Sequence, residues 1–238
     1  GHDLHELLGA QFTRDDTRIL ASGAVVPVTI DLPDPLGSVS LTNLAISGGI
    51  STDGGAGAGS AAVNIFVLDT VARIDDNATV NAAAMGVAPG ADQDVVIAAN
   101  SRTNIEGGAG AGGISIGNAG VGIGLDVNVV VENTRALVGS GVAVKAGGDI
   151  ELRANSDQDF TSVAATAGVS TDGTGVGGSV SVYIVTTNTE AIAAGGAGAA
   201  LQAGGGVAVT ADAPFDLTQI AGALAYGNSA GIGISSTV

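Results

Sequence analysis

The chain of 238 residues contains no cysteine and no tryptophan. Without cysteine it can form neither a disulfide bond nor a thiolate metal site, and cysteine usage says nothing about its compartment. Only 3% of its residues are aromatic, so a cleft built to hold sugar rings is poorly supplied. It also has no run of the roughly 18 apolar residues that a membrane-spanning helix needs. The sequence therefore predicts no membrane insertion.

Positive charge is scarce as well. The chain has 7 basic and 23 acidic residues, for a formal net charge of −16, and Lys145 is its single lysine. Nucleic-acid binding requires clustered lysine and arginine, so nucleic acid is excluded as a partner. The same imbalance disfavours anionic membrane surfaces and favours solubility. An acidic exterior attracts divalent cations.

Glycine and small or β-branched residues dominate what remains. The chain has 40 glycines and 45% hydrophobic residues, and a glycine-and-valine-rich unit returns every 55 to 64 residues from about Leu44 onward. One landmark occupies residues 64–72, 128–136 and 183–191, and a second occupies residues 94–101, 149–156 and 206–212. Because the order of the landmarks is preserved, a repeat architecture is predicted.

The repeats read as strands. In residues 178–184 valine and isoleucine alternate with serine and tyrosine, which is the two-residue period of a strand. Overlaying the copies stacks two predicted core columns, Val63 with Val127 and Val182, and Ile65 with Val129 and Ile184. The opposite face carries Phe66, Val130 and Val185. That face is either covered by a second layer or exposed as an interaction face.

Equivalent residues that stack in successive copies predict an all-β fold, a parallel β-solenoid (β-helix) of about 55-residue repeats. An antiparallel sandwich is the rival. Each repeat holds either two rungs or one large rung with several strands, and the sequence leaves both open. Residues 1–36 are expected to be an irregular N-terminal lead-in or cap, and residues 37–238 the β-solenoid repeat domain.

Calcium is the one cofactor left open, and no other is predicted. Asp53 and Asp172 occupy equivalent Ser-Thr-Asp-Gly turns, and Asp157 and Asp159 lie one residue apart, which are arrangements that oxygen-seeking cations use. Aspartate before glycine is also an ordinary turn pair. The remaining acidic pairs are spread over different repeats, so no catalytic residue is assigned.

The motifs also resemble a known family. The pattern G-[IV]-S-T-D-G, G-G-S-V-S-V, T-x-N-T-x-A and G-D-[IV]-x-L-x-A-N-S, found in residues 168–191 and 148–156, resembles the repeats of giant filamentous bacterial adhesins. These are haemagglutinin-like and leukotoxin-like β-strand-repeat proteins of Gram-negative cell surfaces. The resemblance covers about residues 44–238. It implies a right-handed β-helical stalk that is exported and anchored through other segments of a longer protein, with no catalytic residues.

We therefore expect a non-catalytic stalk or adhesive scaffold segment of a secreted bacterial cell-surface protein. Its parent protein would bind a receptor or glycan on a host or neighbouring cell. The alternative is a self-assembling extracellular matrix or surface-layer fibre, in which copies of the chain associate. A β-helical polysaccharide-active enzyme is the third reading.

Overall fold

The computed structural model describes residues 38–81 and 90–238, so the predicted lead-in, residues 1–36, lies outside the described residues. The described chain is all-β and contains no helix. Its strands are β1 (Ser38–Ser51), β2 (Ala56–Ile74), β3 (Thr79–Val80), β4 (Val95–Ser115), β5 (Ala119–Val138), β6 (Ala143–Ala146), β7 (Ile150–Ser170), β8 (Thr174–Ala193), β9 (Ala200–Ala203), β10 (Val207–Asp212), β11 (Phe215–Gly227) and β12 (Ala230–Thr237).

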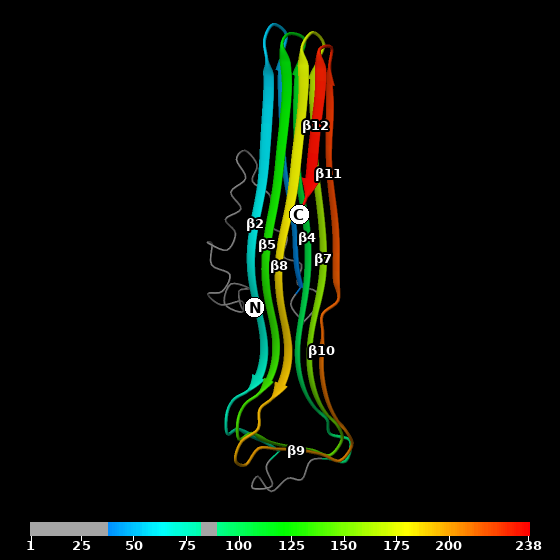
Figure 1. Cartoon of the computed structure of the whole chain (residues 1–238). Coiled ribbons are helices and arrows are strands. Elements are labelled where there is room, and N and C mark those ends of the chain that lie inside the picture. Colours follow the sequence, from blue (N-terminus) through cyan, green and yellow to red (C-terminus); the bar gives the residue numbers. More distant parts are fainter. Residues whose placement is uncertain (1–37, 82–89) are drawn as a thin grey trace, which may run out of the picture.

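The strands form three parallel sheets. Sheet I has the order β1-β4-β7-β10, with β11 also paired to β7; sheet II has the order β12-β8-β5-β2; and sheet III has the order β3-β6-β9. The chain visits the sheets in the same order each time, and we call each such passage a coil. Figure 1 shows the long strands of sheets I and II side by side, with sheet III crossing at one end.

The predicted stacking of equivalent residues is confirmed. Val63 pairs with Val127 and Val127 with Val182, so like residues of coils 64 and 55 residues apart are neighbours in sheet II. Every pairing among the described strands is parallel, which excludes the antiparallel rival. Each repeat corresponds to one large coil, and its strands are up to 21 residues long.

The predicted core columns, however, lie on the wrong face. Ile65 is 70% exposed and Ile184 is 54% exposed, whereas Val130 is 0% exposed. Along β5 the buried residues are the even-numbered ones from Gly120 to Val138. They point toward sheet I, because a strand turns alternate side chains to opposite faces. The face predicted to be the core is thus the outer face of sheet II.

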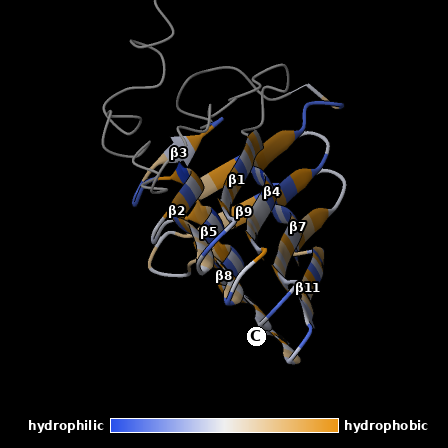
Figure 2. Cartoon of the chain, turned by 90° about the horizontal axis from the view of Figure 1, so that it is seen from above, coloured by the Kyte–Doolittle hydropathy of each residue, from blue (hydrophilic) through white to orange (hydrophobic). Residues whose placement is uncertain are grey.

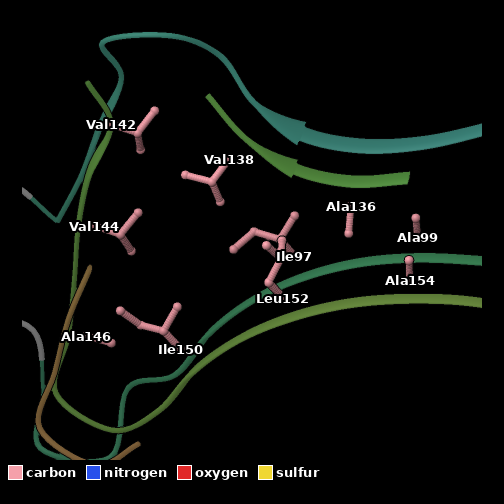
Figure 3. Close-up of a cluster of buried hydrophobic side chains, with 10 residues drawn as sticks. All are labelled: Ile97, Ala99, Ala136, Val138, Val142, Val144, Ala146, Ile150, Leu152 and Ala154. Carbon is pink, nitrogen blue, oxygen red and sulfur yellow. The ribbon is translucent and has the colours of Figure 1, made fainter. Parts of the chain in front are cut away.

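Two apolar clusters fill the interior at different heights along the strands. At the end where the three sheets meet, the buried residues are Ile97, Ala99, Ala136, Val138, Val142, Val144, Ala146, Ile150, Leu152 and Ala154 (Figure 3). Further along, Ile105, Val130, Phe160 and Tyr183 form a second cluster. Because the aliphatic chains come from all three sheets, the first cluster fixes the corners of the coil.

Near the opposite end the two long sheets approach closely. Gly122 of β5 faces sheet I, and a Cβ atom added there would collide with the carbonyl oxygens of Ala167 and Ala111. Only glycine fits at such a position. The interior is therefore thin at the Ser115–Ala119 end of the coils and wide at the end that carries sheet III.

Candidate functional site: the buried polar ladder and the outer faces

The predicted calcium residues Asp53 and Asp172 lie in the turns between sheets I and II, where both are exposed. Asp53 belongs to the first coil and Asp172 to the third, so the two turns are two strand spacings, or about 10 Å, apart. Serine shapes these turns instead. Ser51, Ser115 and Ser170 stack in register, and each side-chain hydroxyl accepts a hydrogen bond from a glycine N–H two or three residues further on, at 2.9–3.1 Å.

The other predicted calcium residues, Asp157 and Asp159, lie on the outer face of β7. Asp157 forms an ion pair with Arg102, with 3.5 Å between Oδ2 and Nε. Asp159 stands beside Asp216 of β11, and all four residues line a shallow hollow at the junction of β10 and β11. Within residues 38–81 and 90–238 no group of three or more acidic, histidine or cysteine side chains could hold a metal ion. The four aspartates do not converge on one site.

The predicted interaction face also needs correction. Val130 is fully buried, and Phe66 and Val185 pack against the cluster that contains it. Phe160 stacks on Tyr183 in the same cluster, with ring centroids 5.7 Å apart. Of the two readings left open by the sequence, a covering layer is correct, because sheet I covers this side of sheet II.

A ladder of polar side chains crosses the interior. It lies between the second apolar cluster and the thin end of the coils. Asn43 donates from Nδ2 to Oδ1 of Asn64, and Asn64 donates to Asn128, both at 2.6 Å. Asn128 in turn donates to Oδ2 of Asp126 at 2.8 Å. These side chains are buried, so the ladder links the first two coils through hydrogen bonds that water does not replace.

Asp126 ends the ladder as a buried carboxyl group. Its Oδ2 atom also accepts a hydrogen bond from Ser162 of β7, whereas its Oδ1 atom is buried without a partner. Burial raises the pKa of Asp126 above its ordinary value of 3.8, and the hydrogen bonds from Ser162 and Asn128 offset part of that rise. No arginine or lysine forms an ion pair with Asp126 in the described chain.

The carboxylate of Asp126 also acts on Tyr183. Burial, together with the nearby Asp126 charge, raises the pKa of the Tyr183 hydroxyl. The hydroxyl stays protonated and donates to the carbonyl oxygen of Thr161 at 3.3 Å. Tyr183 takes the place of the asparagine of the preceding coils, since it pairs with Asn128 in sheet II. It continues this row of side chains with an apolar ring and one hydroxyl group.

A second buried carboxyl group, that of Glu132, is better satisfied. It accepts hydrogen bonds from Thr103 at 3.0 Å, from Ser156 at 2.8 Å and from Gln158 at 3.0 Å. Three donors facing one buried carboxyl group replace the water it loses on folding. Like Asp126, Glu132 is sealed from solvent and is not placed to meet a substrate.

The outer face of sheet II is apolar and free of charge over much of its length. It comprises every second residue of 57–67 on β2, 121–131 on β5, 176–186 on β8 and 232–236 on β12. We call this surface the apolar face. Only Thr186 and Ser236 interrupt its glycine, alanine, valine, leucine and isoleucine side chains. Figure 2 looks along the strands, with β2, β5 and β8 of sheet II on one side and β1, β4 and β7 of sheet I on the other.

The outer face of sheet I differs from it. It has apolar rows near the Ser115–Ala119 end, but the next rows carry Glu106, Asp159 and Asp216. Glu106 accepts a hydrogen bond from Thr42 at 3.4 Å. The two faces of the molecule are therefore chemically unlike, with charge on sheet I and none on the apolar face.

The sequence contained a signal for the polar ladder. Asn64 and Asn128 occupy equivalent places in their repeats, and asparagine is uncommon in strands unless its side chain has a partner. Their partners on sheet I could not be read from this signal, because only the coil brings Asn43 to Asn64 and Ser162 to Asp126.

Protein-family models, curated proteins and solved structures give no match to this chain. Among the described residues there is no helix that could cross a membrane.

Proposed function

We propose that the chain is a β-solenoid segment that serves as a non-catalytic stalk or adhesive scaffold of a secreted bacterial cell-surface protein. The observation that carries this proposal is the unbroken parallel register of β2, β5 and β8. Residues 56–74 pair one for one with 120–138, and all of these pair in turn with residues of β8. Coils that superimpose in this way can be added without limit. A repeating array of this kind extends a protein and presents surfaces along its length.

The interior suits a role in which the chain must resist mechanical force. Stacked asparagines and the hydrogen-bonded carboxyl group of Glu132 fix the packing of the coils, and a slip by one residue would turn Asn64 and Asn128 outward and break their hydrogen bond. Between the ladder and sheet III, the two apolar clusters hold the two long sheets together. Such an interior resists sliding of one coil over the next.

Catalysis is disfavoured by the placement of the carboxyl groups. Asp126 and Glu132 are buried, and the outward aspartates Asp157 and Asp159 lie on a surface without tryptophan and with few other aromatic rings. Glycoside cleavage requires two carboxyl groups that flank a bound sugar. Asp157, Asp159 and Asp216 line only a shallow hollow.

Antibody labelling of intact cells of the source organism tests the proposal. An antibody raised against this chain should label cells without permeabilisation, because a stalk or scaffold is displayed outside the envelope. Labelling that appears only after permeabilisation would contradict the proposal. A glycan array probed with the purified chain separates the two roles, since a scaffold with adhesive surfaces binds glycans and a spacer does not.

A further inference from the structure

We propose that the apolar face binds the apolar face of a second copy of this chain, forming a two-fold symmetric dimer. The inference goes beyond the proposed function and does not depend on it. It rests on the size of this surface, on its lack of charge and on its shape.

The size of the apolar face matches that of a stable interface. Each outward residue of a sheet covers about 32 Å², which is two residue rises by one strand spacing. About 20 outward positions thus present roughly 650 Å² on each copy, or about 1,300 Å² in the pair, within the range of specific protein interfaces. A single apolar patch of this size is at or above the largest found on ordinary monomers, about 300–600 Å².

The shape of the apolar face is complementary to itself. One row across the sheet reads Gly59, Ile123, Gly178 and Ile234. Ile123 is 56% exposed and Ile234 is 67% exposed, and a Cβ atom added at Gly178 would meet nothing within 4 Å. Each isoleucine in this row thus stands beside a glycine that leaves space.

A two-fold axis parallel to the strands, placed between β5 and β8, reverses the order of the row on the second copy. Ile123 then lies over Gly178 of the other copy, and Ile234 lies over Gly59. Each contact occurs twice, as in any interface in which both subunits use the same surface. The remaining rows bring valine and leucine side chains together at the usual spacing of stacked sheets, about 10 Å.

Charge selects this face over the outer face of sheet I. A second copy seated on sheet I would bury Asp159 and Asp216 without a partner for each, which is costly. The apolar face carries no such group. The net charge of −16 still makes the two copies repel one another, so dimerisation should strengthen as salt screens that repulsion.

Sedimentation velocity of the full chain over a concentration series tests the proposal. The unmodified chain is expected to dimerise, and Ile123→Asp should weaken the dimer at least about tenfold, because it buries two unpaired carboxylates. Ile220→Asp is the matched control, since Ile220 is 55% exposed on the outer face of sheet I. That variant should dimerise like the unmodified chain.

An exchange of side chains provides the sharper test. Gly178→Ile alone should weaken the dimer because it meets Ile123 of the second copy, and Ile123→Gly alone should weaken it by leaving a void. The double variant restores one large and one small residue at each contact and should recover association. Circular dichroism checks that each variant is folded.

Three results would overturn the proposal. The first is an unmodified chain that stays monomeric at every concentration and salt. The second is equal weakening by Ile123→Asp and Ile220→Asp, or a double variant weaker than both single variants. The third is a monomeric chain that floats with phosphatidylcholine vesicles, which would assign the apolar face to lipid.

Discussion

At the scale of single residues, the interior of this protein is unusual for the carboxyl groups it contains. Asp126 and Glu132 occupy the same strand six residues apart, and both are buried. Glu132 has three donors around it, whereas Asp126 has an oxygen atom without a partner. An unsatisfied buried atom destabilises a fold by about 1–3 kcal/mol. Among the described residues, Asp126 is therefore a buried group whose ionisation is expected to weaken the fold.

The variant Asp126→Asn tests that expectation. Because the pKa of Asp126 is raised in the folded protein, the folded chain binds more protons than the unfolded chain above pH 3.8, and its stability falls as pH rises toward the folded pKa. Asparagine does not titrate, so the variant should gain stability relative to the unmodified chain as the pH rises across that interval.

Urea unfolding at several pH values between 3 and 8 measures this difference. An effect of the amide group that does not depend on pH changes the free energy of unfolding by the same amount at every pH. The part of the stability difference that varies with pH therefore reports the ionisation of Asp126. A stability difference that is constant from pH 3 to pH 8 would show that the carboxyl group is not strained by burial.

At the scale of the strand, the central question is which face turns inward. The two faces of β5 differ in a misleading way. The outward face carries most of the β-branched residues between Val121 and Val131, whereas glycine and polar residues such as Asp126 and Glu132 dominate the inward face, so hydrophobic alternation selects the wrong face. The sequence predicts Val129 in the core and leaves Val130 either covered by a second layer or exposed, whereas in the structure Val130 is buried and Val129 lies on the outer face of sheet II. The predicted pairing of equivalent residues was right, because it follows from matching the repeats. The predicted core face was wrong, because the face that turns inward depends on contact with the other sheet.

Two neighbouring substitutions in β5 test this assignment. Val130→Asp should lower the free energy of unfolding by about 3–5 kcal/mol or prevent folding, because the carboxylate would be buried among Ile105, Phe160 and Tyr183 without a partner. Val129→Asp should cost about 1 kcal/mol or less, since its side chain points outward. Denaturant titration of dilute samples compares the two.

The matched chemistry of this pair makes the result decisive. Both substitutions replace valine by aspartate on the same strand, so differences in strand propensity cancel. If Val129→Asp were the more damaging variant, the core columns predicted from the alternation would be correct and the face assignment in the structure would be wrong.

Turns show a second limit of the sequence analysis. Asn77, Gly141 and Gly198 have positive φ angles of 58°, 69° and 86°, at equivalent places where sheet II passes to sheet III. Glycine and asparagine adopt this conformation at lowest cost. The glycine-rich composition predicted turns in general. It did not single out this column, because glycine is also abundant within the strands.

At the scale of the whole molecule, long strands set the shape. Strands of about 20 residues extend roughly 65 Å, whereas four coils stack over only about 19 Å. The described part is thus a slab whose long dimension follows the strands, as Figure 1 shows. Growth by further coils would widen it along the stacking direction.

Stability should be graded along that stacking direction. Residues 131–138 of β5 are paired with both β2 and β8, whereas residues 186–193 of β8 pair only with β5 in the described chain. In a parallel sheet each strand bonds alternately to its two neighbours. About half of the amides in residues 186–193 should therefore exchange faster than their equivalents in residues 131–138.

Hydrogen–deuterium exchange read by mass spectrometry compares these two segments directly, since they occupy equivalent positions one coil apart. Residues 174–181 of β8, which are paired on both sides, provide the internal control and should be protected. Equal protection of residues 186–193 and 131–138 would mean that another part of the chain covers the free edge of β8.

Strand content, the repeat and the pairing of equivalent residues follow from the sequence alone, since they depend on local alternation and on the similarity of one copy to the next. The inward placement of Val130 and of the Asn64–Asn128 ladder, and the outward placement of Ile65 and Ile184, depend on the packing of the sheets. Alternation shows that a strand has two unlike faces, but the face that turns inward is the one whose side chains find partners on the other sheet. Here sheet I contributed the partners of Asp126 and Glu132, and those partners are distant in sequence.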